Sequence, residues 1–161
     1  MIQKLILFLQ GLPKELITVI VAMLPIAELR GSIPVALSFG MKPWSAFWLS
    51  IIGNMIPVVP VLLFLGPLSK WLRRFKIFDK FFTWLFNRTE KNSEPIQKYG
   101  FWGLAIFVGI PLPITGAWSG CAAAFLLQIK FWRAFFAILL GVLIAGSIVI
   151  SASLGVIKLF F

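Results

Sequence analysis

Residues 23–37, "MLPIAELRGSIPVAL", place a carboxylate and a guanidinium, Glu28 and Arg30, inside an otherwise apolar run. Pro25, Gly31 and Pro34 interrupt the same run, and proline and glycine are the residues that most often break or kink a helix. The stretch therefore predicts two short helical arms around a central break, with both charges between the arms.

The composition around this stretch indicates an integral membrane protein. Apolar residues make up 60% and aromatic residues 16% of the 161 residues, which is more than the core of a soluble domain needs. Each of four apolar stretches could cross a hydrocarbon core of about 30 Å; they lie at about 16–41, 44–68, 101–129 and 131–161. We therefore exclude soluble enzymes and expect a multi-pass protein of the cell membrane, either a prokaryotic inner membrane or a plasma membrane.

The charge of the chain is strongly positive, with 15 Lys and Arg against 5 Asp and Glu and no His, for a net charge of +10. The basic residues lie between apolar segments rather than on a separate module, so we expect anionic lipid headgroups as partners and no nucleic acid. The sequence has no metal-ligand cluster, no paired carboxylates and no phosphate-binding glycine loop. We expect no catalysis, metal or cofactor, and Cys121, the single cysteine, should be a packing residue.

Two motifs recur at an offset of 88 residues. The tripeptide "LPI" occurs at 24–26 and again at 112–114, and "KPWSAF" at 42–47 corresponds to "KFWRAF" at 130–135. Gly53 and Gly141 share the same offset. The shared offset predicts a duplication within one membrane domain, with repeat 1 at about 13–66 and repeat 2 at about 99–161. Chance matching between apolar segments is the alternative.

The second repeat contains a break of its own in "GIPLPITGAWSG", residues 109–120, at Pro111, Pro113 and Gly116. Arms of about ten residues are about 15 Å long, half the hydrocarbon thickness. Each repeat therefore predicts a re-entrant helical hairpin followed by a transmembrane helix.

Irregular backbone at the membrane midplane is tolerated only against protein or water, so the two hairpin tips should face each other. A hairpin that returns to its own side, followed by a single crossing, gives the two halves opposite orientations, as in the inverted repeats of many transporters. The predicted fold is thus an all-α inverted repeat. The alternative is a pair of proline-kinked helices that span the membrane and give parallel repeats.

The connector at 67–98 predicts an amphipathic helix in the membrane interface, because its aromatic and basic residues fall on different faces. It holds eight basic residues, namely Lys70, Arg73, Arg74, Lys76, Lys80, Arg88, Lys91 and Lys98. The bias of positive charge toward the cytoplasm predicts that the connector, Lys130 and Arg133 lie inside the cell, with Lys42 and both termini outside.

The motifs "ELRGSIP" at 28–34 and "PLPITGAW" at 111–118 resemble those of the small multidrug export protein family. That family looks like a compact relative of the DedA/VTT (SNARE-associated) membrane proteins. The resemblance implies two facing re-entrant hairpins and a role in proton-dependent drug tolerance or in movement of lipids and lipid carriers. DedA proteins typically carry arginines around the second hairpin proline, whereas residues 107–115 contain none here. Arg30 would then be the sole phosphate ligand.

Glu28 and Arg30 are the leading candidates for a substrate or ion site, because a charge at the bilayer centre costs about 2.5 to 3.5 kcal/mol. The alternative is that they pair with each other or with hairpin carbonyls and only hold the hairpin tip closed. Asn54 precedes Pro57 and Pro60, which should kink the first span. Its amide could line the same cavity, and the alternative is a residue whose hydrogen bonds are satisfied at the kink. Thr115, Trp118 and Ser119 could add hydroxyl contacts and an aromatic surface, although packing is the simpler role for Trp118.

We expect a secondary transporter that moves a small or amphipathic substrate between the hairpin tips, with protons coupled through Glu28. One alternative is a flippase for an anionic lipid carrier such as a polyprenyl phosphate, bound by Arg30 and helix N-termini. Another is a membrane scaffold that transports nothing. In the last span, small residues at every fourth position, Ser147, Ser151 and Gly155, suit close helix contact, for example in a homodimer.

Overall fold

The structure is a computed structural model that describes residues 11–64, 98–112 and 115–160, together with residues 79, 80, 83, 84 and 87. Every regular element in these residues is a helix, which confirms the predicted all-α class. The connector helix predicted at 67–98 lies almost entirely outside the described residues, as does the predicted break residue Pro113.

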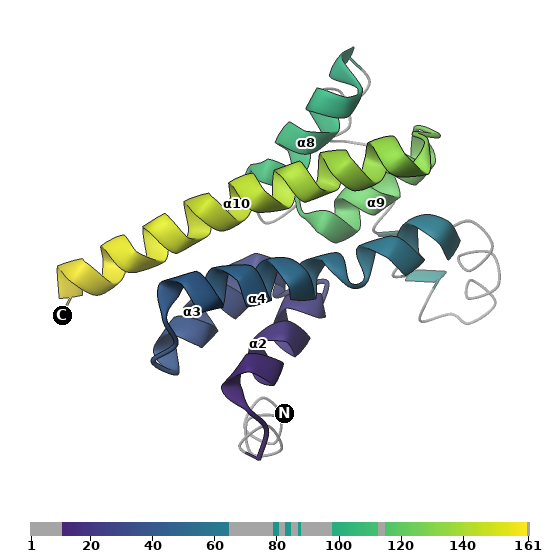
Figure 1. The fold of residues 1–161 in the computed structure, drawn as a ribbon. Coiled ribbons are helices and arrows are strands. Elements are labelled where there is room, and N and C mark those ends of the chain that lie inside the picture. Colours follow the sequence, from purple (N-terminus) through teal and green to yellow (C-terminus); the bar gives the residue numbers. More distant parts are fainter. Residues whose placement is uncertain are drawn as a thin grey trace.

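The first half consists of two short helices and one long one (Figure 1). Helix α2 (Lys14–Met23) is followed by a break that contains Pro25, then by α3 (Glu28–Ser38) and α4 (Pro43–Met55). A turn at residues 56 and 57 interrupts α4 before the chain continues as helix to Phe64. This is the predicted kink, and it follows from Pro57, which has no N–H to donate to the carbonyl of residue 53.

The second half has the same order of elements. Helices α8 (Phe101–Gly109) and α9 (Ala117–Leu126) flank a break that contains Pro111 and Gly116, and α10 (Phe131–Phe160) follows.

Each half contributes one helix that could cross a membrane. Among the described residues, two helices are long and apolar enough to do so. The first is the 22-residue stretch Pro43–Phe64, which continues α4, and the second is the 26-residue stretch Phe131–Val156 within α10.

The two halves also share a turn. Gly40, which follows α3, has a φ of 69°, and Gln128, which follows α9 and lies 88 residues later, has a φ of 53°. In both turns the N–H of the next residue donates to the carbonyl five residues before it, at 3.1 Å in the first half and 2.9 Å in the second. This is the Schellman pattern of helix ends, so the turn into each long helix is built in the same way.

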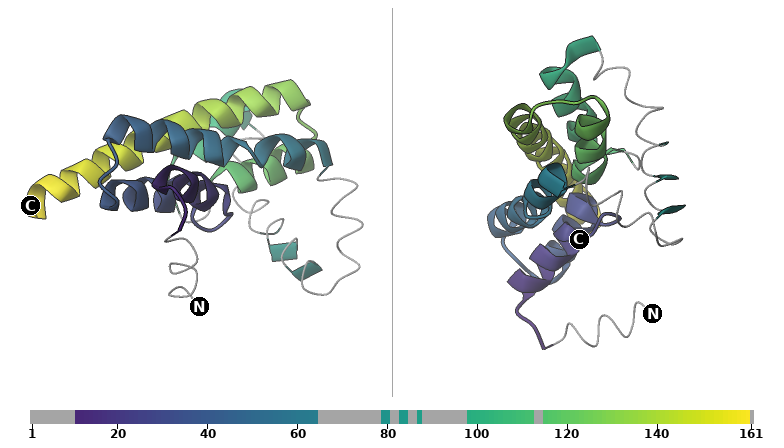
Figure 2. Two further views of the ribbon diagram at one scale, coloured as in Figure 1. Left: turned by 60° about the horizontal axis from the view of Figure 1, so that its bottom comes forward. Right: turned by 90° about the vertical axis from the view of Figure 1, so that its right-hand side faces the viewer.

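The long helices α4 and α10 lie side by side and run in opposite directions (Figures 1 and 2). Glycines allow each long helix to approach the first short helix of its own half. A Cβ at Gly53 would lie 2.7 Å from the carbonyl oxygen of Val19 in α2, and a Cβ at Gly141 would lie 2.7 Å from the carbonyl oxygen of Ala105 in α8. The shared Gly53 and Gly141 thus have equivalent packing roles.

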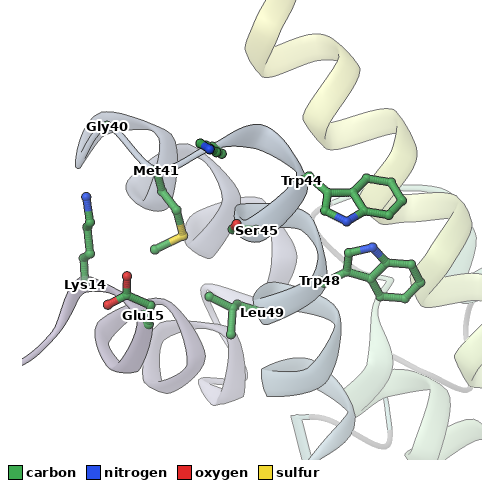
Figure 3. Close-up of a pocket in the computed structure, with 9 residues that line it drawn as sticks. Lys14, Glu15, Gly40, Met41, Trp44, Ser45, Trp48 and Leu49 are labelled. Atoms are coloured by element: carbon green, nitrogen blue, oxygen red, sulfur yellow. The ribbon is translucent and has the colours of Figure 1, made fainter.

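The start of α2 and the end of α3 lie next to each other. Lys14 Nζ, at the start of α2, donates to the carbonyl of Phe39, just after α3, at 3.4 Å. Beside this contact is an outer hollow of about 580 Å³ (Figure 3). It is lined by Lys14, Glu15, Gly40, Met41, Lys42, Trp44, Ser45, Trp48 and Leu49.

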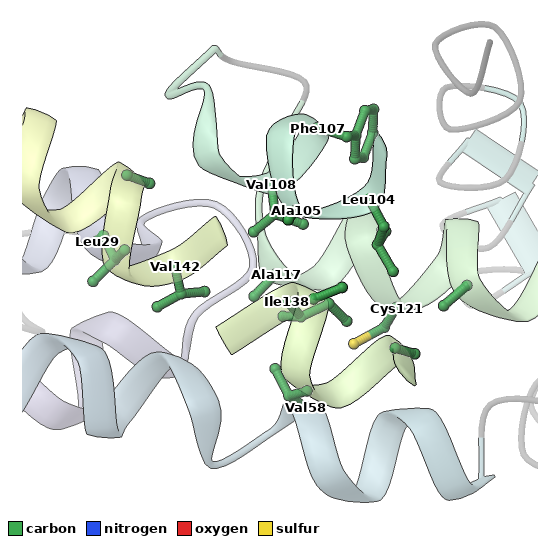
Figure 4. Close-up of a cluster of buried hydrophobic side chains, with 14 of the residues drawn as sticks. Leu29, Val58, Leu104, Ala105, Phe107, Val108, Ala117, Cys121, Ile138 and Val142 are labelled. Atoms are coloured by element: carbon green, nitrogen blue, oxygen red, sulfur yellow. The ribbon is translucent and has the colours of Figure 1, made fainter. Parts of the chain in front are cut away.

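The core lies where the two halves meet (Figure 4). Small residues of α9, including Ala117 and Cys121, pack against larger ones such as Ile138 and Val142 of α10. Cys121 is 1% exposed, which agrees with its predicted packing role. Small side chains let helices approach closely, and this close packing is the main stabilising contact between helices in lipid.

Two of the predicted break residues do not break a helix. Gly31 and Pro34 lie inside α3, and Glu28 and Arg30 lie in its first turn rather than between the arms. Pro34 removes one N–H donor from α3, and the packing of this helix against α2, α4 and α10 outweighs the loss. Gly31 meets a local requirement, because a Cβ there would lie 2.8 Å from the Cβ of Ala27, the residue directly before α3.

Candidate functional site

Glu28 occupies an unusual backbone position at the start of α3. Its φ is 45°, in the left-handed region that costs a residue with a side chain about 1 to 2 kcal/mol. The residue is only 9% exposed. Such a conformation persists only where the surrounding contacts hold it, and for Glu28 those contacts come from the other half of the chain.

The carboxylate of Glu28 lies at the N-terminus of α9. Its Oε1 accepts a hydrogen bond from the backbone N–H of Trp118 at 3.3 Å. Gly116, the residue before α9, offers no side chain to cap the helix, and any Cβ there would overlap the carboxylate. Because the first N–H groups of a helix lack partners within the helix, Glu28 serves as the cap of α9 from 90 residues away.

Arg30 connects the same two segments through a second contact. Its Nη2 donates to the carbonyl oxygen of Thr115 and, at 3.2 Å, to Thr115 Oγ1. The same hydroxyl accepts from the N–H of Leu112 at 3.2 Å and donates to the carbonyl of Ile110. Thr115 therefore holds its own loop together and presents two oxygens to the guanidinium.

Trp118 makes a third contact between the halves, since its indole Nε1 donates to the carbonyl of Met23 at 3.2 Å. Met23 is the last residue of α2, so this bond satisfies a carbonyl that lacks a partner within the helix. Ser119 behaves differently, because its hydroxyl donates to the carbonyl of Gly116 at 3.3 Å within its own turn. The predicted meeting of the two breaks is thus present, and Ser119 takes no direct part in it.

A small cavity lies between these contacts. It is lined by Glu28, Leu29, Arg30, Asn54, Val108, Gly116, Ala117, Val142 and Ala145. About 10 Å³ of it is open to water, which is room for about one molecule. Of the predicted site residues, Glu28, Arg30 and Asn54 therefore share a cavity, while Thr115 and Trp118 bond to its wall. In this arrangement the cavity admits nothing as large as a drug.

Three pairs of cavity residues have the same offset as the two recurring sequence motifs. The pairs, each 88 residues apart, are Glu28 with Gly116, Leu29 with Ala117, and Asn54 with Val142. The pairs are chemically unequal, because the first half supplies the carboxylate and the amide and the second half supplies apolar atoms.

The sequence predicted Gly116 as a break but missed its contact with a carboxylate. A glycine directly before α9 leaves that helix without a capping side chain, which signals that a partner is needed but not which residue supplies it. The sequence also missed the apolar wall of Val142 and Ala145, because nothing distinguishes these residues from the rest of an apolar span. Within the described ranges, no group of three or more His, Cys, Asp or Glu could hold a metal.

The small-residue stripe of the last span faces outward. Ser147, Ser151 and Gly155 are all exposed. The hydroxyls of Ser147 and Ser151 donate to carbonyls of their own helix, at 2.9 and 2.7 Å. The homodimer contact at this stripe stays a prediction.

Comparison with known families gives one match, which covers residues 28–148 and carries the description "Putative small multi-drug export protein". The chain belongs to this family. The matched region begins at Glu28 and includes the second break and every residue that lines the cavity. No curated protein and no solved structure matches the chain.

The family assignment agrees with the two helices that are long and apolar enough to cross a membrane. The chain is therefore a membrane protein, and the name of its family describes an exporter, which is a kind of transporter.

Proposed function

We propose that this member of the small multidrug export family is a proton-coupled secondary transporter of the cell membrane, with Glu28 as the proton carrier. The observation that carries the proposal is the buried carboxylate of Glu28 at the N-terminus of α9, beside Arg30 and a cavity between the halves. A chain that needed only a tight turn would not require a charge there, given the cost of placing one in a membrane.

The proposal includes an inverted repeat with two re-entrant hairpins. The antiparallel course of α4 and α10 supports it (Figure 2), as does the meeting of equivalent residues such as Glu28 and Gly116 at the cavity. Short helices of 9 to 11 residues are about half as long as the hydrocarbon core is thick. The contact of Lys14 with Phe39 supports a first hairpin that returns to its own side.

Protonation of Glu28 would act directly on the contact between the halves. The ionised carboxylate accepts a hydrogen bond at a helix end, where negative charge is favoured. A charge-assisted hydrogen bond contributes about 1.5 to 3 kcal/mol, and loss of the charge removes most of it. Uptake of a proton therefore favours separation of the hairpin tips. A small or amphipathic substrate needs this separation, because the closed cavity has room for only about one water molecule.

The geometry favours this function over movement of an anionic lipid carrier. A phosphate would need Arg30 and the N-terminus of a hairpin helix. Arg30 donates to Thr115, and the N-terminus of α9 is capped by Glu28. A phosphate would have to displace both contacts.

The test uses the purified full-length protein in sealed liposomes, with a lipophilic cationic dye as substrate and an imposed pH gradient. Glu28→Gln keeps the size of the side chain but cannot titrate, so proton-driven flux should fall by roughly tenfold or more while thermal stability is retained. Asp79→Asn is the matched control, because it makes the same chemical change outside the site. Normal pH dependence in Glu28→Gln would overturn the proposal.

Two other results would also overturn it. If Glu28→Gln stays active while Arg30→Ala loses movement of a fluorescent polyprenyl phosphate, the chain is a lipid flippase. If the wild-type protein moves neither the dye nor the lipid, the scaffold alternative holds.

A further inference from the structure

Helices α3 and α4 carry matching polar residues along the interface between them. They are joined by a short turn and run in opposite directions (Figure 1). Steps of four residues keep to one face of a helix, and on each helix such steps connect three buried positions. They are Glu28, Ser32 and Ala36 on α3 and Asn54, Ser50 and Ala46 on α4.

The register of the two helices pairs these residues at three levels. At the inner level, Glu28 and Asn54 line the same cavity. At the outer level, Ala36 and Ala46 belong to one buried cluster with Met41. The middle level, about 6 Å from each of the others, therefore brings Ser32 opposite Ser50.

The polar atoms of this interface have hydrogen-bonding capacity that the protein does not use. Ser32 Oγ, Ser50 Oγ and Asn54 Oδ1 are buried and have no hydrogen-bond partner in the part of the chain that the structure describes. Other helical hydroxyls bond to the preceding turn of their own helix, as those of Thr18 and Ser151 do. Since buried polar groups almost always have partners, water is the small molecule that suits these three atoms.

The second half provides a natural comparison, because its equivalent positions are all apolar. A Cβ at Gly120, the equivalent of Ser32, would lie 3.4 Å from the side chain of Ile138, the equivalent of Ser50. This contact indicates that the middle positions face each other, and it shows that this level is closed by carbon atoms in the second half. The three levels there are Gly116 with Val142, Gly120 with Ile138, and Ala124 with Ala134.

The polar interface leads toward the outer hollow. Met41 packs against Ala36 and Ala46 and also lines the hollow (Figure 3). The charged residues Lys14, Glu15 and Lys42 line the hollow as well. Ala36, Ala46 and Met41 therefore lie between the outer hollow and the two serines, and they form the narrowest part of this path.

Few other charged or titratable groups of the described residues face Glu28. Arg30 comes from its own helix, and Cys121 of α9 is close enough to interact with it electrostatically. The side chains that helices α4, α8 and α10 contribute to the cavity do not titrate; they are Asn54, Val108, Val142 and Ala145.

We infer that Glu28 exchanges protons with one side of the membrane, the side of the α3 to α4 turn, through water bound by Asn54, Ser32 and Ser50. A proton leaves a hydronium ion as its O–H bond breaks, and a new O–H bond forms on the carboxylate. The second half offers no comparable route in this arrangement. The inference deepens the proposed function and rests on the role of Glu28 in it.

One-sided access can be tested with Ag⁺, a thiol-reactive ion close to water in size. Ser50→Cys and its repeat equivalent Ile138→Cys are each made in a Cys121→Ala background and reconstituted in sealed liposomes. Ag⁺ is added to one face at a time, and the thiols that remain are counted by maleimide labelling after unfolding. Lys42→Cys, labelled with an impermeant maleimide, identifies the face of the α3 to α4 turn.

The thiol of Ser50→Cys should react roughly tenfold faster than that of Ile138→Cys or more, and only from the face on which Lys42→Cys is labelled. Ser32→Cys should behave like Ser50→Cys, which covers the case in which one variant fails to fold. If the thiol of Ser50→Cys reacts with Ag⁺ no faster than that of Ile138→Cys, or equally fast from both faces, the inference is wrong. The assay needs no substrate, so its result is independent of the proposed transport. If the protein moves the dye but Ag⁺ does not reach Ser50→Cys, the proton route is wrong and the proposed transport stands.

Discussion

The carboxylate of Glu28 and the backbone N–H of Trp118 are joined by a hydrogen bond of 3.3 Å across 90 residues of chain. This bond places a charged side chain of one half on the helix end of the other. The hydrogen bond to the carboxylate of Glu28 therefore contributes to the contact between the two halves.

Gly116→Ala should destabilise the protein by about 3 kcal/mol or more. A Cβ at this position would overlap the carboxylate of Glu28, and the φ of 155° suits glycine alone. Thermal unfolding in detergent micelles measures the loss. Gly100→Ala is the control, because Gly100 also has a positive φ, 54°, but no atom of the described residues lies within 4 Å of a Cβ placed there; it should cost about 1 kcal/mol. Equal losses in the two variants would show that the carboxylate does not contact Gly116.

Thr115→Val should cost about 1 to 2 kcal/mol, because valine keeps the shape of threonine but removes the hydroxyl that Arg30 and Leu112 contact. The loss should shrink when the same change is made in an Arg30→Ala background, since the two residues share a contact. The measurement is a double-mutant cycle of thermal stability. Strictly additive losses would contradict the contact between Arg30 and Thr115.

Trp118→Phe should cost about 1 kcal/mol through loss of the indole hydrogen bond to the carbonyl of Met23, while an aromatic ring is kept. Trp132→Phe is the matched control, because Trp132 is 67% exposed and should change stability little. Thermal unfolding of both variants gives the comparison. A loss in Trp132→Phe as large as in Trp118→Phe would mean that ring size, rather than the bond, matters.

Single cysteines at Lys14 and Lys42, in a Cys121→Ser background, should react with an impermeant maleimide from the same side of the membrane. Both lysines line the outer hollow, and a re-entrant hairpin returns to the side from which it entered. A cysteine at Lys130, the equivalent of Lys42, should react from the opposite side. If Lys14 and Lys42 are labelled from opposite sides, the first two helices cross the membrane and the inverted repeat is wrong.

The helical class and the helix breaks could be predicted from the sequence. In a membrane the backbone must satisfy its own hydrogen bonds, which favours helices, and the membrane thickness sets how long a crossing helix must be. Pro25, Pro57 and Pro111 were correctly assigned to helix interruptions, since proline lacks the N–H that a helix needs. Gly31 and Pro34 were assigned wrongly, because the same residue types can lie inside a helix when packing against a neighbour outweighs their cost.

The candidate site was predictable only in part. Glu28 and Arg30 stood out because charges are rare in apolar segments, and Asn54 because it precedes a predicted kink. The contact of Glu28 with Gly116 could not be predicted, since it depends on how two segments 88 residues apart meet. The buried hydroxyls of Ser32 and Ser50 gave no sequence signal, because most serines in a helix bond to their own backbone.

In the proposed inverted repeat, Glu28 and Gly116 are counterparts, and their contact means that the two halves differ at this point. Two identical units meeting about an axis would bring two identical side chains to this point, and the space holds only one. A carboxylate from one half therefore fits here only opposite a residue without a side chain in the other half. On the proposed arrangement the halves are not interchangeable: a tandem of two first halves would bring two carboxylates together, and a tandem of two second halves would have no carboxylate there to take up a proton.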